Sequence, residues 1–224
     1  MSRHRRSQVH HAVEEIGVVP LYYHSDAAVA VDIAAACAAG GARVVEFTNR
    51  GDRAISVFQA LTERLGESEP GLMLGVGSVV DAATAALFIA AGAEFVVSPY
   101  FVGAVARLCH SRRVAYVPGA ATPWEVAQAE ASGAELVKLF PASILGPDFV
   151  RHHLGPSPDS RLIPTGGIAA TEEAVTAWIR AGAAAIGLGS QVIPSRSVAP
   201  ADVDRLPERL RTIRGWVAAA RAGM

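Results

Sequence analysis

Lysine is almost absent from this sequence. Lysine and arginine together number 20 among 224 residues, and a residue-by-residue reading finds a single lysine, Lys138. Arginine stays protonated, whereas a lysine in apolar surroundings can act as a nucleophile. Lys138 stands between two aliphatic residues in the stretch ELVKLFPA, which favours a chemical role. A salt-bridged lysine at a strand end is the structural alternative.

An excess of charge of one sign is also missing. Acids and bases nearly cancel, at a net charge of −1, without the basic stripe that is typical of nucleic-acid binding. No run approaches the roughly eighteen apolar residues of a membrane span. Arg5 and Arg6 resemble an export signal, but two glutamates and no apolar run follow. We expect a cytoplasmic protein in which the segment MSRHRRSQ forms a short polar helix that caps the domain.

Cysteine is scarce. Cys37 and Cys109 both lie in alanine-rich helical patterns, and two isolated thiols form neither a disulfide framework nor a metal site. The adjacent histidines at 10–11 and 152–153 diverge on a helix and make poor joint metal ligands. The GVGS at 75–78 lacks the third glycine of a dinucleotide fingerprint. We therefore expect no metal and no cofactor.

Short β-branched runs alternate with alanine-rich helical segments along the whole chain. There are eight such runs, at 18–23, 43–48, 72–77, 94–99, 114–119, 135–140, 161–167 and 184–190. Several helical segments end in glycine, which favours a helix stop before the next strand. One strand and one helix per unit, eight times over, predict a single α/β domain over residues 1–224, a (β/α)8 TIM barrel. In such barrels the chemistry lies where strands end and loops begin.

Glu46 is the second candidate for chemistry. Strand alternation puts Val44, Glu46 and Thr48 on one face of the run VVEFT, and the outer face of a covered strand should be apolar. Glu46 is therefore expected to point into the barrel, where a carboxylate needs a partner or a role in proton transfer. A structural ion pair with Arg50, four residues later, is an equal alternative.

Two glycine-rich segments follow the last two strand runs. PTGG spans 164–167 and GLGS spans 187–190. Glycines let backbone N–H groups approach an anion, and many barrels hold a phosphate between these two loops. Either segment alone would be an ordinary turn. Their joint position predicts a phosphate site.

These motifs together resemble the family of 2-keto-3-deoxy-6-phosphogluconate (KDPG) aldolases and 4-hydroxy-2-oxoglutarate aldolases. The similarity runs from about residue 17 to residue 194. It is carried, in the family's order, by VVEFTNRG, LGVGSV, FVVSP, VPGAATPWE, VKLFPAS, PTGGI and GLGSQVIP.

The resemblance implies a role for each matching position. Lys138 would form a Schiff base with a 2-keto acid, and Glu46 would transfer protons. The remaining positions would bind substrate: Arg50 and Ser78 the pyruvate carboxylate, Pro99 and Phe140 the pocket wall, Thr165 the sugar stereochemistry, and Gly166, Gly167, Gly189 and Ser190 the phosphate. The resemblance also implies a metal-free class I aldolase of a phosphorylated 2-keto acid, acting in the Entner–Doudoroff pathway as a homotrimer.

Some positions depart from well-known members. Asn49, the pair Ala120–Ala121 and the stretch 143–149 differ near the pocket, and His24 is an unassigned loop residue. Thr165 resembles the residue of the gluconate-specific branch of the family more than that of the galactonate-specific branch. Three alternatives stay open: a galactonate-specific aldolase, a barrel isomerase that uses Glu46 as a base without an imine, and a non-catalytic metabolite-binding barrel.

Overall fold

Short parallel strands and helices alternate along the chain in the computed structural model, which describes residues 3–194 and 198–224. The helices are α1 (Arg6–Ile16), α2 (Ala27–Ala39), α3 (Ala54–Ser68), α4 (Ala82–Ala90), α5 (Gly103–Arg112), α6 (Pro123–Ala131), α7 (Ala142–Leu154), α8 (Glu172–Arg180) and α9 (Pro200–Ala222). The strands are β1 (Val18–Tyr22), β2 (Val44–Thr48), β3 (Met73–Gly77), β4 (Phe95–Val97), β5 (Ala115–Val117), β6 (Gly119–Ala120), β7 (Val137–Leu139), β8 (Leu162–Pro164) and β9 (Ile186–Leu188).

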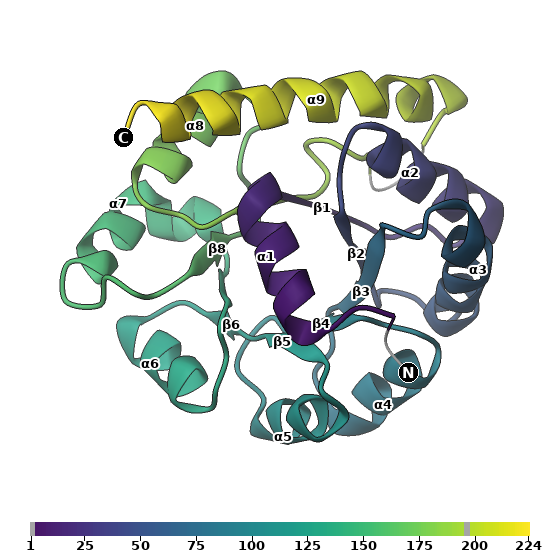
Figure 1. Cartoon of the computed structure of the whole chain (residues 1–224), viewed down its shortest axis with the longest axis horizontal. Helices are drawn as coiled ribbons and strands as arrows, with labels where there is room; N and C mark the ends of the chain where they lie inside the picture. Colours follow the sequence, from purple (N-terminus) through teal and green to yellow (C-terminus); the bar gives the residue numbers. More distant parts are fainter. Residues whose placement is uncertain (1–2, 195–197) are drawn as a thin grey trace.

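The strands surround the centre of the molecule, and helices α2 to α9 lie outside them (Figure 1). One sheet has the order β5-β4-β3-β2-β1-β9, and a second has the order β6-β7-β8. Every strand pair is parallel. An isolated bridge from Thr165 to Gly187 connects the end of β8 with β9. The chain therefore has an α/β fold with a curved parallel sheet.

The fifth predicted strand is divided in two. β5 pairs with β4, and β6 pairs with β7, with Pro118 between them. Proline has no N–H to donate to a sheet, although its carbonyl still accepts from Lys138 N at 2.9 Å. The eight predicted strand runs thus each contain a strand, but the run at 114–119 is interrupted at Pro118.

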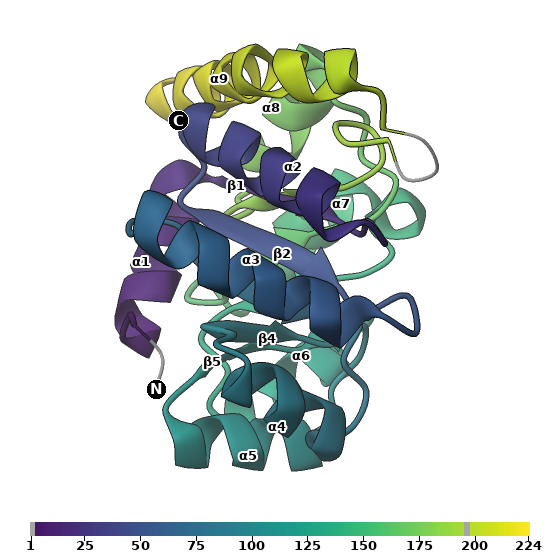
Figure 2. The ribbon, with the colours of Figure 1, turned by 90° about the vertical axis from the view of Figure 1, so that its right-hand side faces the viewer.

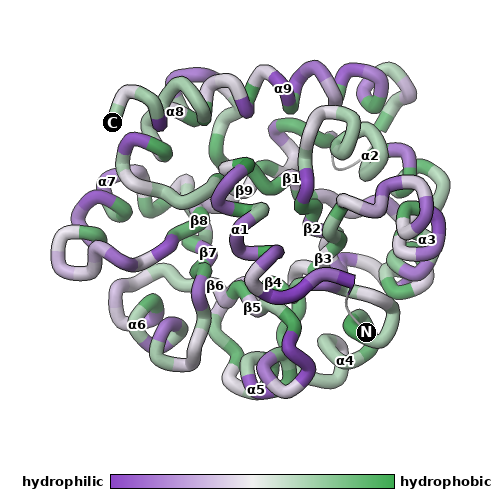
Figure 3. Tube along the Cα trace, in the orientation of Figure 1, coloured by the Kyte–Doolittle hydropathy of each residue, from purple (hydrophilic) through white to green (hydrophobic). Residues whose placement is uncertain are grey.

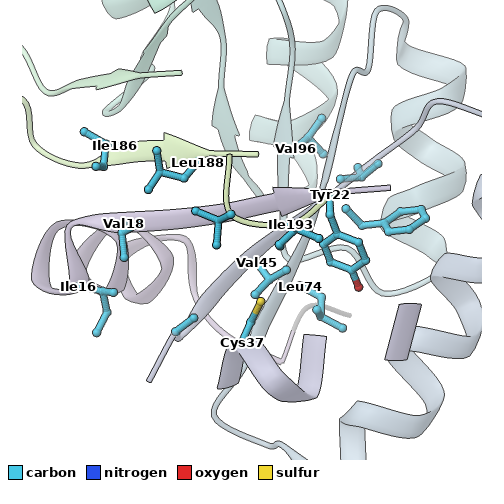
Figure 4. Close-up of a cluster of buried hydrophobic side chains, with 14 of the residues drawn as sticks. Ile16, Val18, Tyr22, Cys37, Val45, Leu74, Val96, Ile186, Leu188 and Ile193 are labelled. Carbon is cyan, nitrogen blue, oxygen red and sulfur yellow. The ribbon is translucent and has the colours of Figure 1, made fainter. Parts of the chain in front are cut away.

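Most strands send alternate side chains to two different clusters. Val45, Phe47 and Leu139 belong to the larger cluster, which also holds the buried faces of the helices. Figure 4 shows Cys37 of α2 against Val45 and Leu74. Val44 instead belongs to a smaller central cluster. Much of the chain along the strands is coloured hydrophobic in Figure 3, in agreement with the burial of both strand faces.

Helix α1 lies across the amino ends of the strands, on one side of the molecule (Figure 2). It begins at Arg6, so it overlaps only the end of the predicted polar helix, whose first two residues lie outside those described. Its face is apolar: Val9, Ala12 and Val13 are buried in the central cluster. The helix bounds were predicted wrongly: the described residues of the charged segment are not buried, and the helix extends beyond it because apolar residues follow at helical spacing. Within the described residues, no helix is long and apolar enough to cross a membrane.

Candidate active site

Lys138 lies in the middle of β7 and points to the inside of the sheet. Its neighbours Val137 and Leu139 face the helices, so alternation turns Lys138 inward. It is buried, with 7% of its surface exposed. Its strand partners are Gly119 and Ile163. The position matches the prediction from the ELVKLFPA segment.

Glu46 meets Lys138 across the interior. Glu46 lies in β2 with 3% of its surface exposed, and Lys138 Nζ donates to its Oε1 at 3.5 Å. The two residues are 92 positions apart in the chain. The predicted inward direction of Glu46 is therefore correct. The alternative pairing with Arg50 is not formed, because Arg50 turns to Ser78 instead.

A pocket of about 250 Å³ opens above this pair at the carboxyl ends of the strands. Lys138 lies in its wall, and its Nζ is 5.6 Å from the centre of the Phe140 ring. The pocket joins residues from several strand ends, which is where a barrel enzyme holds its substrate. Eight of the eleven predicted site residues line it: Arg50, Lys138, Phe140, Thr165, Gly166, Gly167, Gly189 and Ser190.

The three remaining predicted residues lie behind the pocket wall. Glu46 is reached through Lys138. Ser78 is a hydrogen-bond partner of Arg50, whose Nε lies 3.5 Å from the Ser78 Oγ. Pro99 packs with its backbone on Gly119, the strand partner of Lys138. They therefore support pocket residues rather than line the pocket.

The two glycine-rich loops meet in this pocket as predicted. Gly166 and Gly167 have φ angles of 96° and 75°, a region that side chains rarely adopt. On the second loop the backbone turns after Gly189, whose carbonyl accepts from the N–H groups of Val192 and Ile193. No helix begins within the described residues 190–194 that follow Gly189, so an anion here would meet loop N–H groups on that side.

The sequence interpretation did not name several other residues of the pocket. Tyr23, Thr48 and Gln191 all line it. Thr48 was placed on the correct face of its strand, and its hydroxyl donates to the Tyr22 carbonyl at 3.2 Å. Tyr23 directly follows the buried end of β1. Its position at the carboxyl end of a strand was sufficient to predict that it lines the pocket.

Two further regions behave differently from the pocket. His24 is a loop residue whose Nδ1 accepts from Asp26 N at 3.1 Å, and it does not line the pocket. The stretch 143–149 lies within α7, which is broken at Gly146 by a φ of 75°. Ser143 at its start packs beside Gly167. The stretch is therefore a kinked helix and not an open loop.

The two cysteines are free thiols in the interior. Both are buried, and burial raises the pKa of the Cys37 and Cys109 thiols to about 12. A thiol with such a pKa stays protonated and unreactive near neutral pH. The described part of the chain contains no group of three histidine, cysteine or acidic residues that would hold a metal ion.

The fold and the site define an α/β protein whose one lysine meets a buried carboxylate beside a glycine-lined pocket. The pattern of the KDPG and KHG aldolase family matches residues 9–208, and the chain belongs to this family.

Known relatives agree with this assignment. The chain is 33% identical to a 2-dehydro-3-deoxy-phosphogluconate aldolase of Treponema pallidum over 197 residues, 87% of this chain and 90% of the relative. It is 35% identical to the corresponding enzyme of Pseudomonas aeruginosa over 155 residues, 69% of either chain. The 2-keto-3-deoxy-6-phosphogluconate aldolase structure from Zymomonas mobilis has a TM-score of 0.81 at 26% identity. It covers 93% of this chain and 97% of that one.

Proposed function

We propose that this protein is a class I aldolase that cleaves 2-dehydro-3-deoxy-6-phosphogluconate to pyruvate and glyceraldehyde 3-phosphate. The observation that carries the proposal is the contact between the only lysine of the sequence and the buried carboxylate of Glu46, at 3.5 Å. The contact lies beside a pocket whose lining includes both glycine loops. Family membership supports the same activity.

Lys138 is the proposed nucleophile. Its neutral amine attacks the C2 ketone, and loss of water from the carbinolamine gives an imine. The protonated imine withdraws electrons from the C3–C4 bond. Glu46 accepts the proton of the C4 hydroxyl, directly or through a water, as this bond breaks. The aldehyde leaves, and the enamine takes up a proton and is hydrolysed to pyruvate and free Lys138.

The other pocket residues are proposed to hold the substrate. Arg50, oriented by Ser78, would bind the carboxylate of the keto acid. Gly166, Gly167, Gly189 and Ser190 would bind the phosphate at the opposite end. Phe140 would cover the imine, Pro99 would support the wall, and Thr165 would contact the sugar hydroxyls. Binding at both ends orients the bond that is broken between them.

We also propose one closed eight-stranded barrel over residues 1–224, with β5 and β6 as one interrupted strand and α1 as its cap. The bridge from β8 to β9 and the central cluster that α1 shares with the strands support this proposal. A homotrimer is the proposed assembly. Several large apolar side chains are exposed and could be buried between subunits: Leu87, Tyr100 and Trp124. Light scattering after size exclusion would measure the assembly.

Borohydride reduction in the presence of pyruvate tests the mechanism. We expect one reduced-pyruvate adduct, mapped by mass spectrometry to Lys138 and absent from Lys138→Ala. Lys138→Arg should lose cleavage almost completely, because guanidinium forms no imine. A folded protein without an adduct would exclude the imine and favour the isomerase. Cleavage rates with the gluconate, the galactonate epimer and 4-hydroxy-2-oxoglutarate then identify the aldehyde partner.

A further inference from the structure

The last residue of β3 lies against the Glu46 side chain. A Cβ placed on Gly77 would be 1.8 Å from Glu46 Oε1, 2.6 Å from Cδ and 2.9 Å from Cγ. Non-bonded carbon and oxygen atoms do not approach this closely. The Glu46 carboxylate therefore occupies the space that a side chain at position 77 would need. Oε1, the atom nearest to that space, is also the atom that faces Lys138.

The backbone of Gly77 gives no other reason for glycine. Gly77 is absent from the residues with positive φ, and it pairs with Thr48 in an ordinary parallel ladder. Its carbonyl accepts from Asn49 N at 2.8 Å, a bond that any residue can form. An alanine could adopt this conformation without strain. The conflict is therefore with the Glu46 side chain alone.

A methyl group at position 77 would move Glu46 rather than break the strand. The atoms in conflict are the far end of a flexible side chain, which can rotate. The space below is small: a cavity of about 20 Å³ lies between Glu46, Lys138 and the α1 residues Val9 and Val13, room for about one water. A rotated carboxylate would lose its place at Lys138 Nζ.

We propose that Gly77 is a positioning residue for the aldol reaction. Because Gly77 has no side chain, the Glu46 carboxylate can lie between β3 and Lys138, with its Oε1 3.5 Å from Lys138 Nζ. This inference rests on the proposed roles of Lys138 and Glu46. Gly77 itself contacts neither the substrate nor Lys138. It acts only by leaving the space that the Glu46 carboxylate occupies.

The test is a double-substitution cycle of Gly77→Ala and Glu46→Ala. We expect Gly77→Ala to lower kcat about 100-fold, the scale of a misplaced catalytic group, with a much smaller change in KM. End-point borohydride trapping of pyruvate on Lys138 should be retained. In the Glu46→Ala background, Gly77→Ala should lower kcat no further, because the conflicting side chain is gone.

Two glycine substitutions serve as controls. Gly215→Ala in α9 meets no atom within 4 Å and should leave kcat unchanged. Gly75→Ala, two residues earlier on β3, would meet the Phe95 ring at 2.3 Å. Its effect should be on stability, and it should be the same with or without the Glu46 side chain.

The outcomes distinguish a failure of the proposed role of Gly77 from a failure of the proposed aldolase function. Near-normal kcat in folded Gly77→Ala, or an equal loss in the Glu46→Ala background, overturns the role of Gly77 while trapping on Lys138 still supports the aldolase. Absence of an adduct in the unsubstituted protein overturns the proposed function itself. If Gly77→Ala alone does not fold, recovery of folding on adding Glu46→Ala supports the contact, and failure of the double variant overturns it.

Discussion

The two ends of the strands both hold buried carboxylates, but they satisfy them differently. At the amino end, Glu94 is fully buried and accepts from His4 Nδ1 at 2.8 Å, His4 N at 3.1 Å and Leu74 N at 3.3 Å. Arg3 adds a charge at 3.6 Å. At the carboxyl end, the Glu46 side chain has one polar contact among the described residues, with Lys138 Nζ at 3.5 Å.

The number of hydrogen bonds distinguishes a carboxylate with a structural role from one that is available for catalysis. A buried carboxylate with several short hydrogen bonds ties elements together, and breaking the set is costly. A carboxylate with one long contact keeps lone pairs for other partners, such as a substrate hydroxyl or a water. Glu94 joins the N-terminal segment to β3 and β4, whereas Glu46 stays available beside the pocket.

The largest expected effect is kinetic and belongs to Glu46. Glu46→Gln should lower kcat for cleavage by about 10²- to 10⁴-fold, the range of a lost general acid–base group, with a small shift of the unfolding midpoint. Steady-state pyruvate release and thermal unfolding measure both quantities. A kcat within about threefold of the unsubstituted protein would assign proton transfer to another group.

The next effect is on stability and belongs to Glu94. Glu94→Gln should lower the free energy of unfolding by about 3 kcal/mol, because the amide has fewer acceptors for His4, Leu74 and Arg3. Urea unfolding measures this change, and kcat of the folded protein should not change. Glu135→Gln is the matched control. Glu135 also binds the N-terminal segment but is 40% exposed, so we expect less than about 1 kcal/mol. Equal losses would contradict the comparison.

Arg221 of α9 should have a smaller effect. Its guanidinium donates to the carbonyls of Glu14 and Glu15 at the end of α1 and of Ala184 before β9. Arg221→Ala leaves these acceptors without the donor, and we expect about 1–2 kcal/mol less stability. Arg211→Ala removes a single exposed bond to Ala39 and should cost less. A reversed order in urea unfolding would show that α9 is held by its apolar face alone.

The smallest effect is a pH dependence at the amino end. Burial lowers the pKa of His10 from 6.5, against the opposing influence of Glu135. Between the lowered pKa and 6.5 the unfolded chain binds more protons, so the free energy of unfolding should fall as the pH falls through this window. Above pH 6.5 the contribution is constant. His10→Gln should flatten the dependence in urea titrations from pH 8 to pH 5, values chosen to bracket the window.

His11 provides the control for this titration. Its side chain is 75% exposed and lies next to His10 on the same helix. His11→Gln should keep the slope of the unsubstituted protein. A slope that persists in His10→Gln but disappears in His11→Gln would reverse the assignment.

Much of this arrangement was predictable from the order of residues. Alternation in VVEFT indicated that Glu46 faces inward, and the scarcity of lysine singled out Lys138. Both predictions depend on local chemistry and a period of two. The pairing was not predictable in the same way: Arg50, four residues from Glu46, was as good a partner on sequence grounds as a lysine 92 positions away.

Other features depended on neighbours that are distant in sequence. The apolar face of α1 was missed because its partners are the amino ends of the strands, such as Val44 and Leu136. The importance of Gly77 is likewise invisible in a GVGS segment, since it comes from the side chain of the adjacent strand.

The sequence by itself determined the alternation of strands and helices, the inward face of the VVEFT strand and the one lysine able to form an imine. Those properties follow from backbone periodicity and from the chemistry of single side chains. Only the tertiary structure decided that Glu46 of β2 meets Lys138 of β7 and that Gly77 leaves room for the carboxylate. Curvature of the sheet brings residues that are far apart in the sequence within contact distance. No local sequence pattern specifies which of these residues will meet.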